Sequence, residues 1–186
     1  MKIFVTGATG LLGKAVVKQL HEQGHETRSL VHATAINRDD SFANTEIVWG
    51  DITREEEHAD YVKGCDAVVH CAWNFIRGND VEAYQKANID PAISLMRAAF
   101  QQGVSRFITI SSVSVYGLEP AQDGHVFNEQ DEFCSYDDAM DVYPRAKQQS
   151  EIAMTAVANE IGMPMTIIRP GLLYSDDVAP VKKMIK

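Results

Sequence analysis

The chain has 186 residues, 45% of them hydrophobic, which is enough to bury a core as one domain. Acidic residues outnumber basic ones by 26 to 17, and the net charge of −9 argues against nucleic acid or an anionic membrane as a partner. The 3 cysteines are odd in number and lack metal-ligand spacing, so we expect reduced thiols in a cytoplasmic protein and no metal site. We expect no export signal or membrane span, because the chain starts as a strand and no apolar run approaches about 18 residues.

The first predicted element is a buried strand at residues 2–6, which runs directly into Gly7, Gly10 and Gly13. A helix is predicted at 11–23 from apolar residues at helical spacing. In this context Gly7 permits a tight turn, and Gly10 lets the backbone approach a pyrophosphate at the helix N-terminus. Gly13 allows close packing of helix on strand. A strand, a glycine turn and a helix together predict a dinucleotide site, although a glycine-rich turn without a ligand is the alternative.

The second predicted strand, residues 26–31, ends at His32 and has no carboxylate at its tip. A carboxylate there usually binds the ribose 2′-hydroxyl of NAD. Its absence removes repulsion against a 2′-phosphate, with which His32 or Arg38 could pair. The cofactor prediction is therefore NAD(P) with a slight lean to NADP. The alternative is that His32 and Arg38 are ordinary loop residues.

Strand and helix patterns alternate along the rest of the chain. Strands are predicted at 46–49, 66–70, 106–110 and 165–168, and helices at 54–62, 80–102 and 138–161. This alternation predicts an α/β fold with a doubly wound parallel sheet and helices on both faces. Two irregular stretches remain, 32–45 and 117–137. We expect the second to overhang the substrate side of a cleft, unless it is a solvated acidic loop.

A tyrosine and a lysine stand four residues apart on the predicted helix 138–161. Tyr143 and Lys147 therefore share a helix face, and Pro144 places Tyr143 near the helix start. A nearby ammonium lowers the pKa of a tyrosine from about 10, which suits it to acid or base work. Ser112 follows the strand 106–110 at the sheet edge where ligands bind, so it could polarise a substrate oxygen. The alternative for Ser112 is a loop cap.

These motifs together resemble the extended, epimerase/dehydratase-like branch of the short-chain dehydrogenase/reductase superfamily. The matching segments occur in family order over nearly the whole chain: 6–13, 50–52, 70–72, Asn88, 111–117, 143–147 and 169–171. The resemblance implies a Rossmann fold and a small-molecule substrate.

The resemblance also implies roles for individual residues. Tyr143 would be the catalytic acid/base, Lys147 would lower its pKa and bind the nicotinamide ribose, and Ser112 would polarise the substrate oxygen. Besides Tyr143 and Lys147, the predicted cofactor-binding residues are Gly7, Thr9, Gly10, Leu11, Leu12, Gly13, His32, Arg38, Asp51, Ile52, Cys71, Ala72, Trp73, Asn88, Ser111, Pro170, Gly171 and Leu172.

The chain departs from parts of the family pattern. Val113 and Ser114 stand where 4,6-dehydratase members carry an Asp-Glu pair, which argues against sugar dehydration. His32 replaces the arginine expected in NADP-preferring reductases. We predict an oxidoreductase or epimerase acting on a carbonyl or hydroxyl of a small molecule or sugar. The alternatives are a dinucleotide-binding regulatory or redox-sensing module without turnover, and a non-functional fragment.

Extended family members continue well beyond the last predicted strand. Residues 1–186 are therefore expected to form the NAD(P)-binding domain, with 163–186 as the start of a truncated substrate lobe. The alternative is a minimal relative that borrows its second lobe from a partner. A homodimer is one way to cover the sheet edge or apolar surface that such a truncation would leave.

Overall fold

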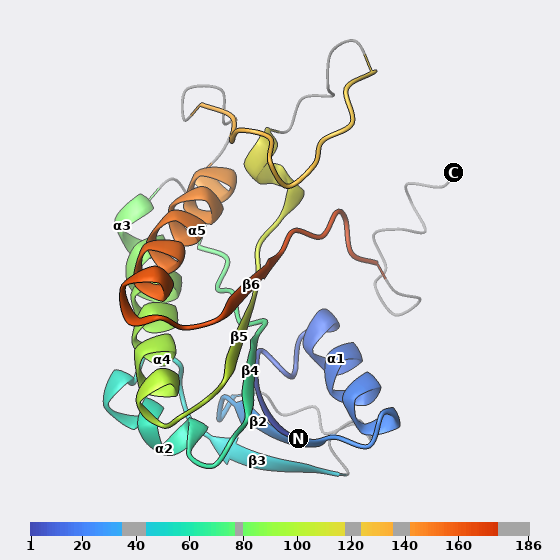
Figure 1. The fold of residues 1–186 in the computed structure, drawn as a ribbon, viewed down its shortest axis with the longest axis vertical. Helices are drawn as coiled ribbons and strands as arrows, with labels where there is room; N and C mark the ends of the chain where they lie inside the picture. Colours follow the sequence, from blue (N-terminus) through green and yellow to red (C-terminus); the bar gives the residue numbers. More distant parts are fainter. Residues whose placement is uncertain (35–43, 77–79, 118–123, 136–141, 175–186) are drawn as a thin grey trace.

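The computed structural model describes residues 1–34, 44–76, 80–117, 124–135 and 142–174. Six strands form one sheet in the order β3-β2-β1-β4-β5-β6, and every neighbouring pair is parallel (Figure 1). The strands are β1 (Lys2–Thr6), β2 (Glu26–Val31), β3 (Thr45–Trp49), β4 (Ala67–His70), β5 (Arg106–Ile110) and β6 (Met165–Ile168). The predicted parallel sheet is confirmed, and each strand lies within one residue of its expected bounds.

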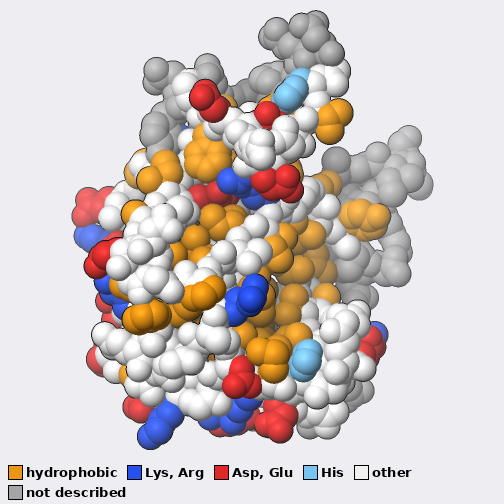
Figure 2. Space-filling model, in the orientation of Figure 1, with side chains coloured by type: hydrophobic (Ala, Val, Ile, Leu, Met, Phe, Trp, Pro, Cys, Tyr) orange, Lys and Arg blue, Asp and Glu red, His pale blue; other side chains and the backbone are white. Residues whose placement is uncertain are grey.

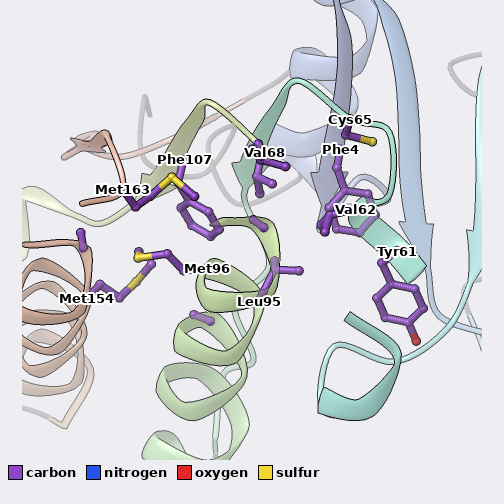
Figure 3. Close-up of a cluster of buried hydrophobic side chains, with 14 of the residues drawn as sticks. Phe4, Tyr61, Val62, Cys65, Val68, Leu95, Met96, Phe107, Met154 and Met163 are labelled. Carbon is purple, nitrogen blue, oxygen red and sulfur yellow. The ribbon is translucent and has the colours of Figure 1, made fainter. Parts of the chain in front are cut away.

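Helices cover both faces of the sheet, as the alternating pattern predicted. On one face lies α1 (Leu11–Glu22), and on the other lie α2 (His58–Val62), α4 (Asp90–Gln101) and α5 (Val142–Ile161) (Figure 1). The strands alternate their side chains between two clusters. Phe4 belongs to the cluster under α2, α4 and α5, whereas Val5 belongs to the cluster under α1. Figure 3 shows Phe4, Val68 and Phe107 from the strands meeting Leu95 and Met154 from the helices.

Two predicted helices are interrupted. The helix expected at 80–102 consists of α3 (Val81–Tyr84), a π-helical segment (Gln85–Ile89) and α4. Pro91 explains much of this break, because it has no N–H to continue the helical hydrogen bonds. The helix expected at 54–62 begins as a 3-10 turn (Glu55–Glu57) before α2. The last helix, α5, begins at Val142, and its predicted residues 138–141 lie outside the described residues.

The strand order reverses between β1 and β4. The chain leaves β1 toward one side of the sheet and β4 toward the other, so a crevice opens beyond their carboxyl ends. Gly7 lies at this point with φ +66°, a conformation that favours glycine. A Cβ on Gly7 would lie 2.6 Å from the backbone nitrogen of Ala72, so the two connections approach too closely for a side chain. The fold thus places a ligand crevice at the glycine loop.

Candidate functional site

The glycine loop forms the floor of the site. Gly10 donates its backbone N–H to the Gly7 carbonyl at 2.9 Å, which closes the turn. Gly10 is also the N-cap of α1, without a side-chain capping bond, and the first turn of α1 carries no acidic residue. The backbone N–H groups of that turn therefore suit an anion such as a pyrophosphate. Gly13 allows the close packing, because a Cβ there would lie 2.1 Å from the Gly7 carbonyl oxygen.

A hollow of about 440 Å³ extends from this loop across the carboxyl ends of the strands. It brings together half of the residues predicted to bind the cofactor, from five separate parts of the chain. Its lining residues are Gly7, Thr9, Gly10, His32, Asp51, Ile52, Thr53, His70, Cys71, Ala72, Trp73, Asn74, Ala87 and Asn88. Arg38 lies outside the described residues, and the other predicted residues that do not line the hollow are Leu11, Leu12, Gly13, Ser111, Tyr143, Lys147, Pro170, Gly171 and Leu172.

The end of the hollow nearest β2 and β3 carries a histidine and a carboxylate. His32 Nε2 lies 3.3 Å from Asp51 Oδ2. Thr53 donates its backbone N–H and its hydroxyl to Asp51 Oδ1, each at 2.9 Å. These hydrogen bonds, led by the backbone one, lower the pKa of Asp51, and His32 acts in the same direction. Although β2 has no acid at its own tip, Asp51 from the neighbouring strand end supplies a carboxylate there.

A buried hydrogen-bond network fixes the segment that follows β4. Thr6 Oγ1 and His70 Nδ1 hydrogen-bond at 2.8 Å, and the Ala72 backbone N–H donates to the same Thr6 oxygen at 3.2 Å. Burial lowers the pKa of His70 to about 3, so the ring is neutral. Sequence reasoning missed this network, although Thr6 and His70 are partners in the register of two adjacent strands. The network holds Cys71, Ala72 and Trp73 over the crevice.

Asn88 supports the same segment from the helical side. Its side-chain oxygen accepts the backbone N–H of Asn74 at 2.6 Å, and its amide donates to the Asn74 carbonyl at 3.1 Å. Asn88 lies in the π-helical segment, a feature that is frequent at functional sites. These contacts position the wall of the hollow that it lines. Direct contact of Asn88 with a cofactor stays a prediction.

The Tyr143–Lys147 pair lies on α5 beside this wall. Lys147 is 4% exposed, donates to the Ile110 carbonyl at 2.9 Å, and lies 5.9 Å from the centre of the Tyr143 ring. Burial lowers the pKa of Lys147 to about 7, against the opposing effects of Glu151 and Cys71. The amine is therefore close to half-charged at neutral pH. The same burial raises the pKa of the Cys71 thiol to about 11, which keeps that thiol protonated.

Aromatic side chains surround the pair. The ammonium of Lys147 lies 3.5 Å from the centre of the Trp73 ring, a cation–π contact. Trp73 also meets the Tyr143 ring edge-on at 6.0 Å, and Phe75 stacks on Tyr143 at 5.4 Å. The sequence predicted that Trp73 lines the cofactor. It did not predict the contact of Trp73 with Lys147 or the stacking of Phe75 on Tyr143. Trp73 thus joins the hollow to the Tyr143–Lys147 pair.

The serines after β5 lie at the sheet edge expected from their position. Ser112 Oγ accepts the Ser114 backbone N–H at 3.1 Å and so caps a 3-10 turn (Val113–Tyr116). The loop-cap alternative for Ser112 is therefore realised, but its hydroxyl proton can still be donated to a substrate oxygen. Within the described part of the chain, Ser111 Oγ is buried without a hydrogen-bond partner. A buried orphan hydroxyl of this kind is suited to a ligand group.

An ion pair braces the loop beyond β5 and β6. Arg169 binds the buried carboxylate of Glu151 through Nη2 at 2.7 Å and Nε at 3.0 Å, and it also hydrogen-bonds the Tyr116 hydroxyl. The Val113 backbone N–H donates to the Pro170 carbonyl at 3.1 Å. Pro170 is therefore held against the serine loop, whereas Leu172 is 76% exposed. Contacts of Pro170, Gly171 and Leu172 with the nicotinamide stay predictions.

Two features are absent from the part of the chain that the structure describes. No helix there is both long and apolar enough to cross a membrane. In the same part of the chain, no three His, Cys, Asp or Glu side chains gather as metal ligands would.

Residues 3–185 match the family described as the NAD dependent epimerase/dehydratase family. The chain belongs to this family. The match confirms the resemblance inferred from the glycine loop, the serine loop and the Tyr143–Lys147 spacing. Among curated proteins, the UDP-glucose 4-epimerase of Vibrio cholerae is 32% identical over 95% of this chain and 53% of its own length.

Solved structures show the same fold. The crystal structure of gox2253 is 31% identical with a TM-score of 0.83, covering 98% of this chain and 56% of that one. A short-chain dehydrogenase/reductase superfamily protein from Agrobacterium tumefaciens, solved with bound NAD, is 26% identical with a TM-score of 0.73. It matches 91% of this chain and 48% of its own. The chain thus spans about half the length of these relatives.

Proposed function

We propose that this protein is an NAD(P)-dependent oxidoreductase or epimerase acting on a hydroxyl or carbonyl of a small molecule or sugar. One observation carries the proposal: the glycine-loop hollow and the Tyr143–Lys147 pair meet at Trp73. A dinucleotide lying in the hollow would bring its nicotinamide end toward that pair. The family membership and the resemblance to a UDP-glucose 4-epimerase support the same class of reaction.

The residues of the hollow fit a dinucleotide. The N-terminus of α1 with Gly10 would hold the pyrophosphate, and Asp51 with Ile52 would contact the adenosine. The buried Ser111 hydroxyl, which does not line the hollow, would gain a partner if the nicotinamide end of the dinucleotide extended beyond the hollow to it. Because Asp51 lies beside His32, the argument for NADP is balanced by a nearby negative charge, and both NAD and NADP stay candidates. When bound, the cofactor supplies hydride transfer to or from a substrate carbon.

Tyr143 would move the proton at the substrate oxygen while the hydride moves at the carbon. Its phenol is weakly acidic on its own, so a cation nearby is needed to stabilise the phenolate. Lys147 provides that cation in its protonated form, which is favoured below its pKa of about 7. Ser112 would donate its hydroxyl proton in a hydrogen bond to the same substrate oxygen, since its lone pair already accepts the Ser114 N–H.

A dinucleotide-binding regulatory or redox-sensing module is the second candidate. The observation that favours it is the Trp73 ring lying 3.5 Å from the Lys147 ammonium, which leaves Lys147 covered. Such a module would bind the dinucleotide in the hollow without using Tyr143. Loss of the tyrosine hydroxyl would then change nothing that can be measured.

The first test is Tyr143→Phe, with NAD(H) and NADP(H) offered together with nucleotide sugars and small carbonyl compounds. We expect turnover to fall by roughly 10²-fold or more, the usual contribution of a positioned acid/base. Dinucleotide affinity should change by less than about threefold, because the cofactor's main contacts are elsewhere. Tyr174→Phe is the matched control, since that side chain is 72% exposed and the same hydroxyl is removed.

The outcomes separate the two candidates. Undiminished turnover in Tyr143→Phe would overturn the catalytic role. Binding of a dinucleotide by the unchanged protein, with no turnover of any compound offered, would favour the regulatory module. Failure to bind either dinucleotide would reject both.

A further inference from the structure

We propose that Trp73 controls access to Lys147: its indole covers the lysine ammonium and must move aside before the nicotinamide-side ribose can reach that amine. The inference rests on the proposed function, because it concerns the same hollow. Trp73 is thus a positioning residue, and its side chain moves only when the nicotinamide-side ribose of the dinucleotide binds.

The surroundings of the amine show why something must move. Lys147 is 4% exposed, so its amine has almost no contact with solvent. The Ile110 carbonyl takes one N–H of the amine at 2.9 Å, and the Trp73 ring covers it at 3.5 Å. The ammonium has a further N–H, but because the amine is buried a ribose hydroxyl can reach it only if one of the covering groups moves aside.

The carbonyl is the more firmly held of the two. Ile110 is the last residue of β5 and is paired with Ile168 of β6, so its backbone is fixed in the sheet. Trp73 lies in the irregular segment after β4, and it borders the hollow. Its indole can therefore leave the amine through a change in side-chain torsion angles, without any shift of the sheet.

The present position of the indole is also incompletely satisfied. Trp73 Nε1 is buried and has no hydrogen-bond partner within the described part of the chain. A buried donor without a partner costs free energy, which opposes the favourable packing on Lys147, Tyr143 and Tyr84. The covered arrangement is thus held by packing, which includes the cluster of Tyr84, Val142 and Ala146, and not by a hydrogen bond of the indole N–H. A ligand that bonds Lys147 competes with those contacts. Its apparent affinity is the intrinsic affinity multiplied by the fraction of molecules in which Trp73 leaves Lys147 uncovered.

The chain offers a direct reporter of this movement. It contains 2 tryptophans, Trp49 and Trp73, so Trp49→Phe leaves Trp73 as the single source of indole fluorescence. Two ligands distinguish the pyrophosphate end of the hollow from the end nearest Lys147. ADP stops at the pyrophosphate, whereas ADP-ribose adds the second ribose but lacks the nicotinamide ring, which could itself quench the indole. Binding of each is measured independently by calorimetry.

We expect both compounds to bind the Trp49→Phe protein and only ADP-ribose to move the Trp73 emission to longer wavelength. In Trp73→Ala, affinity for ADP-ribose should rise by about tenfold, because the competing ring contact is gone. Affinity for ADP should change by less than about twofold. Trp73→Phe keeps a smaller ring and should lie between the two. Urea unfolding of each variant verifies the fold.

Several results would overturn the inference. ADP-ribose could bind without altering the Trp73 emission, or ADP could alter it equally. Trp73→Ala could bind ADP-ribose no better than the parent protein. A different result, no binding of either ADP or ADP-ribose, would instead reject the dinucleotide site and with it the proposed function. Because the emission measurement leaves Trp73 intact, it does not depend on how well the Ala variant folds.

Discussion

Lys147 has a buried amine, and its protonation should be visible in the stability of the whole fold. Burial lowers the pKa of Lys147 in the folded chain to about 7, from an ordinary value of 10.5. Between these two pH values the unfolded chain holds one more proton than the folded chain. The free energy of unfolding therefore rises with pH in this window, and the full penalty of the buried charge is present below about pH 7.

We predict that replacing Lys147 with Met removes this pH dependence. From pH 7 to pH 9, the free energy of unfolding of the parent protein should rise by about 2 kcal/mol more than that of Lys147→Met. Urea titrations at several pH values measure the two slopes. The comparison stops at pH 9 because of Cys71, whose pKa in the folded chain is raised to about 11. At higher pH its thiol ionises in the unfolded chain before it does so in the folded chain, which lowers the free energy of unfolding.

Lys86→Met is the matched control for this prediction. The Lys86 side chain is 70% exposed and pairs with Glu82 on the surface, so its loss should leave the slope unchanged. The Ile110 carbonyl loses a donor in Lys147→Met, but this cost does not vary with pH. Equal slopes for the parent and Lys147→Met would contradict a buried lysine of low pKa.

Features of individual residues were predictable from the sequence where they depend on local properties of the chain, and not where they depend on tertiary contacts. Gly7, Gly13 and the Tyr143–Lys147 pair were predictable because turn geometry and helix periodicity are local properties. The cover of Trp73 on Lys147 was not predictable, since it depends on the torsion angles of a side chain in an irregular segment. The Thr6–His70 bond lies between these cases, because it follows from strand register once the sheet order is known.

Strands and helices also differ in how far the sequence predicts them. Strand bounds were predictable to within one residue, because buried parallel strands are short apolar runs. The π-helical segment before α4 was not, because it combines the missing N–H of Pro91 with the side-chain contacts of Asn88 to Asn74. Those contacts join residues 14 positions apart and have no periodic signature. Tertiary contact, rather than helix propensity, decides such breaks.

Substitutions of two glycines at the N-terminus of α1 should affect folding stability and dinucleotide binding separately. A Cβ on Gly13 would lie 2.1 Å from the Gly7 carbonyl oxygen, so α1 and β1 must move apart. We predict that Gly13→Ala lowers the free energy of unfolding by about 2 kcal/mol, as overpacking does. A Cβ on Gly10 would lie 3.3 Å from the same oxygen, which a small shift can relieve. Gly10→Ala should therefore fold almost normally but bind NAD(P) roughly tenfold more weakly.

Urea unfolding and calorimetry on the two variants measure these effects side by side. The substitution is the same and the two sites are three residues apart, so each variant serves as the control for the other. Equal stability of Gly13→Ala and the parent would contradict the close packing of α1 on β1. Unchanged dinucleotide affinity in Gly10→Ala would show that the pyrophosphate does not lie against this loop.

The β6 edge of the sheet carries exposed apolar surface and a hollow of its own. Figure 2 shows hydrophobic side chains gathered around β6, on a face where Ile168 is 46% exposed. A second hollow, of about 740 Å³, lies against β6, the later part of α5 and the loop that holds Phe127. It is larger than the hollow at the glycine loop, but neither the glycine loop nor Trp73, which contacts Lys147, lines it. The candidate site therefore rests on the chemical groups that gather at the glycine loop, and not on the size of the hollow.

A dinucleotide that spans the crevice should stabilise the whole sheet, because it would contact the ends of β1, β2, β3 and β4 together. Binding to the folded chain at 100 times the dissociation constant adds about 2.7 kcal/mol. For a chain of 186 residues this raises the melting temperature by roughly 5–10 °C. We predict a shift of this size with NAD⁺ or NADP⁺, measured by differential scanning fluorimetry.

Asp51→Asn tests which of the two cofactors the β2–β3 end favours. Asn keeps the oxygen that accepts from Thr53, but it removes the negative charge that lies beside His32. A 2′-phosphate near His32 would be repelled by that charge, so the substitution should increase the melting shift with NADP⁺ relative to that with NAD⁺. Thermal shifts that change equally for both cofactors would place the 2′ position away from Asp51. An absent shift with millimolar concentrations of either would contradict a dinucleotide in this crevice.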